Sequence, residues 1–197
     1  MPAPLLIVLS APSGGGKTTL CQNLLAKYPL MTRAVTCTTR PPRPGERDGV
    51  DYYFLDKTTF NQRVEADEFL EHATVYDNRY GTLKSEVLDK LHHGRDVLLN
   101  VDVQGAAAVR AHAGESPQIN AALVTIFLTT RDMATLEKRL RERGTESAEM
   151  LEKRLNAARQ ELARQNEFQH VVISGTREED LRQLESIIEK ERELRQR

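Results

Sequence analysis

An uninterrupted apolar run joined to a helical pattern by a glycine-rich turn constrains the fold most. Residues 5–9 are all Leu, Ile or Val, which is typical of a parallel strand buried on both faces. Beyond the turn, Leu20, Leu24 and Leu25 recur at helical spacing. The turn and the start of the helix hold Ala11, Pro12, Ser13, Gly14, Gly15, Gly16, Lys17, Thr18 and Thr19. Strand, glycine-rich turn and helix in this order predict a phosphate-binding P-loop.

The P-loop pattern assigns roles to single residues. Lys17 reaches the β- and γ-phosphates of a bound nucleotide and is a catalytic candidate, and the Thr18 hydroxyl is a candidate Mg²⁺ ligand. Ala11 stands where the pattern has its first glycine, which requires a negative φ there. The alternative, a glycine-rich turn that only caps a helix, is disfavoured because the Gly16-Lys17-Thr18 ending is intact.

Strands alternate with helices along most of the chain. Further apolar strands are expected over residues 97–102, 122–128 and 170–173, with amphipathic helices between them. This alternation predicts an α/β fold: a P-loop parallel-sheet core with helices on both faces. Residues 34–87 differ, because they are rich in proline and in short strand patterns, and we expect them to form an inserted small β-rich lobe.

Composition narrows the classes of protein. The 197 residues suit one domain, and 28 Lys+Arg against 29 Asp+Glu disfavour a dedicated nucleic-acid binder. The apolar runs are too short to span a bilayer, and the first residues do not resemble a secretory signal. Cys21 and Cys37 form no C-x-x-C pattern, which disfavours disulfides and zinc. We therefore expect a cytoplasmic protein with no membrane or nucleic-acid partner.

A proline-stiffened loop supplies a second candidate anion site. Arg40 and Arg43 lie three positions apart among Pro41, Pro42 and Pro44. Forked guanidinium groups in a stiff loop suit an anionic ligand, and a Tyr52 hydroxyl could join them. Alone, such a loop is more often plain surface. Downstream of a P-loop it indicates a second phosphate and favours a nucleotide phosphotransferase.

At this point the sequence resembles the guanylate kinases over nearly its whole length. The resemblance rests on residues 11–19, 38–46, 49–54, 80–82, 101–105, 143–146 and 153–155, which occur in the family's order and spacing. It implies transfer of the γ-phosphoryl of ATP to GMP, giving ADP and GDP, with Mg²⁺, in purine nucleotide metabolism. It also implies a single domain with a core (1–33, 88–130 and 158–197), a GMP-binding lobe (34–87) and a mobile lid (131–157).

The resemblance implies which residues bind GMP. The phosphate would be held by Arg40, Arg43, Tyr52 and Tyr80, with Thr36 where the family often has Ser; guanine would be recognised by Glu71, Thr82 and Asp102. A carboxylate accepts both guanine donors, N1–H and the 2-amino group, and a hydroxyl suits O6. Adenine has the opposite polarity at position 6 and no 2-amino group, so we expect strong discrimination. Asp102 is also favoured by its place at the carboxyl end of a core strand.

The resemblance assigns the catalytic lid arginines as Arg139, Arg143 and Arg154. They would neutralise charge on the transferred group, and no covalent intermediate is needed. Without the resemblance they would be interpreted as surface charges paired with neighbouring glutamates.

Two positions depart from the family pattern. Asn100 stands where the family usually has Asp, which would weaken water-mediated support of Mg²⁺. Ser174-Gly175 stands where relatives often carry Asn-Asp near the adenine, so no residue is assigned to the ATP base.

Two alternatives remain open. One is a catalytically inactive binding module, as in scaffold proteins that carry guanylate-kinase-like domains. The other is a kinase for another phosphate-bearing acceptor, such as a sugar bisphosphate. In the favoured interpretation the partners are the small molecules GMP and ATP, and self-association is left open.

Overall fold

A five-stranded parallel sheet forms the core of the computed structural model, which describes residues 3–75, 77–142 and 148–196. The strand order is β2-β7-β1-β8-β9, and every neighbouring pair is parallel. The strands are β1 (Leu6–Ser10), β2 (Thr32–Arg33), β7 (Val97–Asn100), β8 (Leu123–Thr129) and β9 (His170–Ile173). The predicted α/β class with a parallel P-loop core is confirmed.

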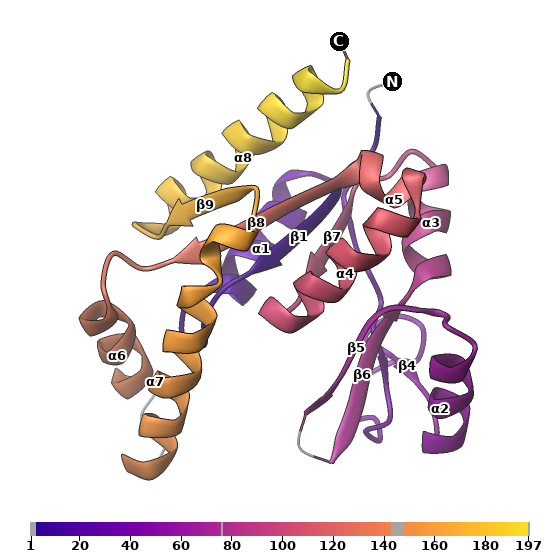
Figure 1. Cartoon of the computed structure of the whole chain (residues 1–197), viewed down its shortest axis with the longest axis horizontal. Coiled ribbons are helices and arrows are strands. Elements are labelled where there is room, and N and C mark those ends of the chain that lie inside the picture. Colours follow the sequence, from indigo (N-terminus) through magenta and orange to yellow (C-terminus); the bar gives the residue numbers. More distant parts are fainter. Residues whose placement is uncertain (1–2, 76, 143–147, 197) are drawn as a thin grey trace.

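Helices cover both faces of this sheet (Figure 1). The alternation of side chains along the first strand shows how: Leu5, Ile7 and Leu9 belong to one buried cluster, and Leu6 and Val8 to the other. The first cluster is completed by α1 (Lys17–Lys27) and α8 (Arg177–Leu194). The second is completed by α3 (Lys84–His92), α4 (Val103–Glu115) and α5 (Pro117–Ala122).

A second sheet forms the inserted lobe. Its order is β4-β3-β6-β5, and it carries α2 (Lys57–Glu65). The strands are β3 (Cys37–Thr38), β4 (Tyr53–Phe54), β5 (Phe69–Val75) and β6 (Asn78–Leu83). The lobe has its own small core of Cys37, Phe60, Phe69 and Leu83.

The chain passes from one sheet to the other between residues 33 and 37. The sequence favoured one short strand over residues 34–37, and this expectation is wrong. Thr32–Arg33 pairs with β7 in the core, whereas Cys37–Thr38 pairs with β4 and β6 in the lobe. A single strand cannot serve both sheets, so the regular structure is interrupted at the crossing.

The helices α6 (Met133–Glu142) and α7 (Ala148–Ala163) form a third cluster, packed through Leu136, Leu140, Leu155 and Ala158. Asp132 precedes the helical spacing of Met133, Leu136 and Leu140, which predicts it as the N-cap. This prediction is confirmed, because its Oδ1 accepts the Thr135 N–H at 2.7 Å. The sequence also predicts that Gly144 ends this helix, but Gly144 lies outside the described residues. A short 3₁₀ turn (Gln165–Glu167) leads from α7 to β9.

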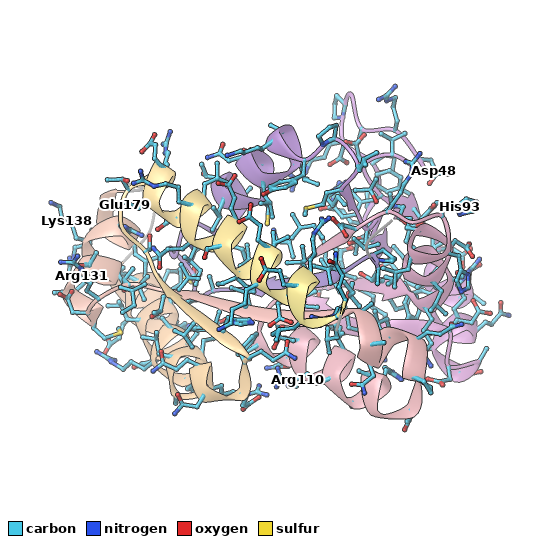
Figure 2. The ribbon with its side chains drawn as sticks, turned by 90° about the horizontal axis from the view of Figure 1, so that it is seen from above. Asp48, His93, Arg110, Arg131, Lys138 and Glu179 are labelled. Atoms are coloured by element: carbon cyan, nitrogen blue, oxygen red, sulfur yellow. The ribbon has the colours of Figure 1, made fainter. Side chains whose placement is uncertain are left out.

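The inserted lobe and the α6–α7 pair lie at opposite ends of the molecule. Asp48 in the lobe and Lys138 on α6 mark these ends in Figure 2, and the lobe and the helix pair are likewise apart in Figure 1. The core between them carries the P-loop. Within the described residues, no helix is both long and apolar enough to cross a membrane.

Candidate active site

The P-loop joins the carboxyl end of β1 to α1. Gly14 and Gly16 have φ of 87° and 89°, a left-handed conformation that glycine adopts without strain. Among the described residues, the non-glycine residue with a positive φ is Asp67, so Ala11 meets the condition for replacing a glycine. The turn therefore has the backbone conformation expected of a phosphate-binding loop.

Lys17 opens α1 and turns toward the end of β7. Its Nζ donates a hydrogen bond to the Val101 carbonyl at 2.8 Å. Burial lowers the pKa of Lys17, and nearby acidic groups, including Asp102 and Glu161, oppose this shift. The Lys17 ammonium group therefore lies near the carboxylates of Asp102 and Glu161, at the position where it would contact an anionic ligand.

A cavity of about 260 Å³ lies between the lobe and the carboxyl end of β7. The cavity brings together five of the eight predicted GMP-site residues, and Arg40, Arg43 and Thr82 are not among its lining residues. It is lined by the predicted contacts Thr36, Tyr52, Glu71, Tyr80 and Asp102. Arg33 and Asn100 also line it. Sequence reasoning missed Arg33, since a single arginine at the end of a two-residue strand carries no signal of its own.

Glu71 on β5 is a buried carboxylate, with only 7% of its surface exposed. Its Oε1 accepts a hydrogen bond from the Thr82 hydroxyl at 2.7 Å. Burial raises the pKa of Glu71, and the Asp102 carboxylate adds to the shift. Thr82 is fully buried beside Glu71, so its hydroxyl orients the carboxylate in this structure.

Asp102 has a second role that the sequence analysis missed. It is the N-cap of α4, and its Oδ1 accepts the N–H groups of Gln104 and Gly105 at 3.0 and 2.8 Å. The side chain is exposed and lines the cavity. Both of these cap hydrogen bonds use Oδ1, which leaves the cap independent of Oδ2. The available signal was an aspartate, a preferred N-cap residue, just beyond the end of a strand.

The two loop arginines are organised by one glutamate. Glu46 Oε1 pairs with Arg40 Nη2 at 2.9 Å, and Glu46 Oε2 accepts the Arg43 N–H at 2.7 Å. The Arg40 guanidinium lies 5.4 Å from the centre of the Tyr52 ring, and the Tyr52 and Tyr80 rings are 6.2 Å apart. An anion at this corner must compete with Glu46 for Arg40.

The structure shows a hydrogen bond for Arg139, one of the three predicted lid arginines. Arg139 on α6 donates from Nη1 to the Ser174 hydroxyl at 3.3 Å, and Ser174 in turn donates to Asp180 at 2.9 Å. Arg154 is half-buried on α7. Arg143 lies outside the described residues. Glu161, in the last turn of α7 and outside the predicted lid, accepts the Ser13 N–H of the P-loop at 3.3 Å, a contact that sequence reasoning missed.

A metal ion at the P-loop would take most of its ligands from phosphate and water rather than from protein side chains. Among the described residues, no group of three or more His, Cys, Asp or Glu side chains could hold a metal ion. The exposed Thr18 hydroxyl beside Lys17 nevertheless suits Mg²⁺, which takes few protein ligands and completes its shell with phosphates and water.

A P-loop on a parallel sheet, facing a lobe whose cavity holds a buried carboxylate, defines the class of P-loop kinases that act on small phosphate-bearing molecules. The guanylate kinase family model matches residues 4–191. Guanylate kinase from Rickettsia bellii is 39% identical over 191 residues, covering 97% of this chain and 96% of that protein. The enzyme from Hydrogenovibrio crunogenus is 43% identical over 182 residues, covering 92% and 85%. The crystal structure of guanylate kinase from Anaplasma phagocytophilum superposes with a TM-score of 0.73 at 27% identity, covering 98% and 88%.

The chain belongs to the guanylate kinase family. The predicted family and its class of enzyme, a nucleotide-binding kinase, are thereby confirmed.

Proposed function

We propose that the protein transfers the γ-phosphoryl of ATP to GMP, giving ADP and GDP. The observation that carries this proposal is the buried carboxylate of Glu71 in the cavity beside Asp102. Thr82 is the hydrogen-bond partner of this buried carboxylate, and a ligand with two adjacent donors would compensate its charge further. Guanine offers such a pair in N1–H and the 2-amino group.

The second carboxylate extends the same recognition. Asp102 keeps Oδ2 available while Oδ1 caps α4, so both carboxylates face one ligand from different elements. Adenine would leave both without the donors they need, which supports GMP over AMP. Thr82 acts through Glu71 in this proposal, because its hydroxyl donates its one hydrogen to Glu71 Oε1; it could donate to O6, as the resemblance implies, only by giving up that hydrogen bond.

The phosphate groups are assigned to the basic residues. The GMP phosphate would be held by Thr36, Arg40, Arg43, Tyr52 and Tyr80. The ATP phosphates would lie on the P-loop, residues 11–19, with Lys17 on the β- and γ-phosphates. Thr18 would bind Mg²⁺, which neutralises phosphate charge. Arg139, Arg143 and Arg154 would complete the charge neutralisation once lobe (34–87) and lid (131–157) close.

The two alternative functions have less support. A binding module without catalysis needs neither the left-handed glycines nor Lys17 at the mouth of the P-loop. A sugar bisphosphate acceptor would suit the arginines but not the buried Glu71. Purine nucleotide metabolism is the proposed context, with GMP and ATP as partners, and the cytoplasmic location stays a prediction.

The direct test is GMP-dependent release of ADP from MgATP. We expect fast turnover in the wild type and a loss of at least about 10²-fold in Lys17→Met, because one preorganised cation at the transferred group is removed. Lys27→Met, at the far end of the same helix, is the matched control and should keep wild-type activity. Wild-type protein that binds ATP but releases no ADP with GMP would contradict the proposal.

A further inference from the structure

A carboxylate from the lid helix occupies the mouth of the P-loop. Glu161, in the last turn of α7, accepts the backbone N–H of Ser13 with its Oε2 at 3.3 Å, across 148 positions of sequence. Ser13 and Glu161 are both half-buried. A P-loop N–H group is a donor that the bound nucleotide uses, so Glu161 engages part of the anion site.

The charges around Glu161 do not favour an anionic substrate. Lys17 is near two carboxylates, Asp102 and Glu161, and both act on it electrostatically. Burial raises the pKa of Glu161, which the Ser13 N–H and Lys17 oppose. A negative charge beside the phosphate-binding loop weakens the binding of ATP. Glu161 therefore does not serve to raise the affinity for ATP, and its presence needs a different explanation.

The position of Glu161 on α7 supplies that explanation. Arg154 lies two turns earlier on the same helix, so both side chains share a face. The partner helix α6 also touches the P-loop: a Cβ at Gly14 would lie 3.0 Å from Leu140 Cδ2 and 3.4 Å from Leu136 Cδ1. The lid helices therefore contact the P-loop through one apolar and one polar contact, and the polar one competes with phosphate.

We propose that Glu161 is a placeholder for the terminal phosphate of ATP. It accepts the Ser13 N–H while the P-loop is empty and is displaced when ATP binds. Displacement frees α7 to carry Arg154 toward the phosphates. Glu161 is thus a positioning residue that links occupancy of the P-loop to the lid. This inference rests on the proposed function, since it takes ATP as the ligand of the P-loop.

The test compares Glu161→Gln with the wild type in binding and in turnover. Glutamine keeps an oxygen that accepts the Ser13 N–H, so only the charge is lost. We expect MgATP to bind roughly tenfold more tightly to Glu161→Gln in the absence of GMP, because one nearby like charge is removed. Inorganic tripolyphosphate, which lacks base and ribose, should show the same gain. KM for ATP should fall while kcat stays within about twofold. Glu152→Gln, exposed on the same helix, is the matched control and should match the wild type.

Three outcomes overturn the inference. A merely structural role predicts that Glu161→Gln binds MgATP as well as or less well than the wild type. A gain for ATP but not for tripolyphosphate would place the effect away from the phosphates. In either case the wild type still binds ATP and the proposed function stands. Wild-type protein that does not bind ATP would overturn both the role of Glu161 and the proposed function.

A second variant, Glu161→Ala, lacks the hydrogen-bond acceptor as well as the charge. It should also bind tripolyphosphate more tightly than the wild type.

Discussion

At the scale of single residues, the candidate site consists of charges held in unfavourable surroundings. Glu71 is buried with Thr82 as its hydrogen-bond partner, and burial lowers the pKa of Lys17. Such groups are expected where ligand binding, rather than folding, supplies the missing partners. The P-loop pattern identified Lys17, and the family resemblance identified Glu71. It did not identify the hydrogen bonds around them, because a contact between separate elements leaves no local pattern.

Replacing Glu71 with glutamine should raise the stability of the folded protein while lowering its activity with GMP. The pKa of Glu71 is raised in the folded state, so folding favours its protonated form. That contribution is complete at pH values below the range of an unfolded glutamate and is lost as the pH rises through the raised pKa. At pH 8 the wild type therefore carries a penalty that Glu71→Gln lacks.

Thermal unfolding without ligands measures this effect. The Tm of Glu71→Gln should exceed that of the wild type at pH 8, by roughly 2–4 °C per kcal/mol regained, and the two should converge on acidification. Glu65→Gln, exposed at the end of α2, is the control. A lower Tm for Glu71→Gln at pH 8 would show that the ionised carboxylate is a net stabiliser.

Two substitutions at Asp102 separate its roles. Asparagine is as good an N-cap as aspartate, so Asp102→Asn should keep the stability of the protein within about 0.5 kcal/mol. Asp102→Ala should lose about 1 kcal/mol, because the Gln104 and Gly105 N–H groups lose their acceptor. Both should raise KM for GMP and leave KM for ATP nearly unchanged. Denaturant unfolding tests the predicted stabilities, and steady-state kinetics tests the predicted KM values. Equal stability of Asp102→Asn and Asp102→Ala would argue against a capping role for Asp102.

At the scale of elements, close approach of α4 to the lobe positions the acceptor cavity. A Cβ at Gly105 would lie 2.9 Å from Val101 Cβ and 3.3 Å from Glu71 Oε2. We expect Gly105→Ala to destabilise the protein by roughly 1–3 kcal/mol and to raise KM for GMP by displacing Glu71.

The same helix provides the control for this prediction. Gly114 has no neighbour within 4 Å of its Cβ position, so Gly114→Ala should stabilise α4 by roughly 0.5–1 kcal/mol. Denaturant unfolding measures the change in the free energy of unfolding for Gly105→Ala and Gly114→Ala. Opposite signs are expected, and two equal effects would mean that the close approach at Gly105 has no energetic consequence.

The sequence predicted elements well where one strong pattern decided them. The P-loop strand, β8 and β9 were expected near their observed bounds, and Leu151, Leu155 and Leu162 at helical spacing predict the long helix α7. The helices α4 and α5 were missed, because alanine fills much of α4 and leaves little apolar periodicity. The hairpin partner β6 was missed because its pairing with β5 depends on register within the lobe.

At the scale of the whole molecule, the lobe and the α6–α7 pair lie apart with the P-loop between them. The proposed reaction needs the arginines of both parts near one pair of phosphates. We therefore expect the radius of gyration to fall when a bisubstrate analogue, adenosine and guanosine joined through five phosphates, is added. Small-angle X-ray scattering measures this, with GMP alone expected to give a smaller decrease. An unchanged radius with saturating analogue would contradict a closing lobe and lid.

The family and the fold class could be predicted from the sequence, because motif order and spacing span nearly the whole chain. The contacts that tie its parts together could not. Glu161 meets Ser13, and Arg139 meets Ser174, only after the core sheet has brought distant segments together. Such contacts depend on tertiary packing and have no local signature.

Base selectivity tests the central claim most directly. ADP release from MgATP should be measured with GMP, AMP, CMP and UMP offered separately, for the wild type and for Glu71→Gln. The account predicts turnover with GMP alone in the wild type, and a fall in kcat/KM for GMP of at least about tenfold in the variant, from the loss of charged hydrogen bonds to guanine. Equal turnover of GMP and AMP by the wild type, or full GMP selectivity in Glu71→Gln, would contradict it.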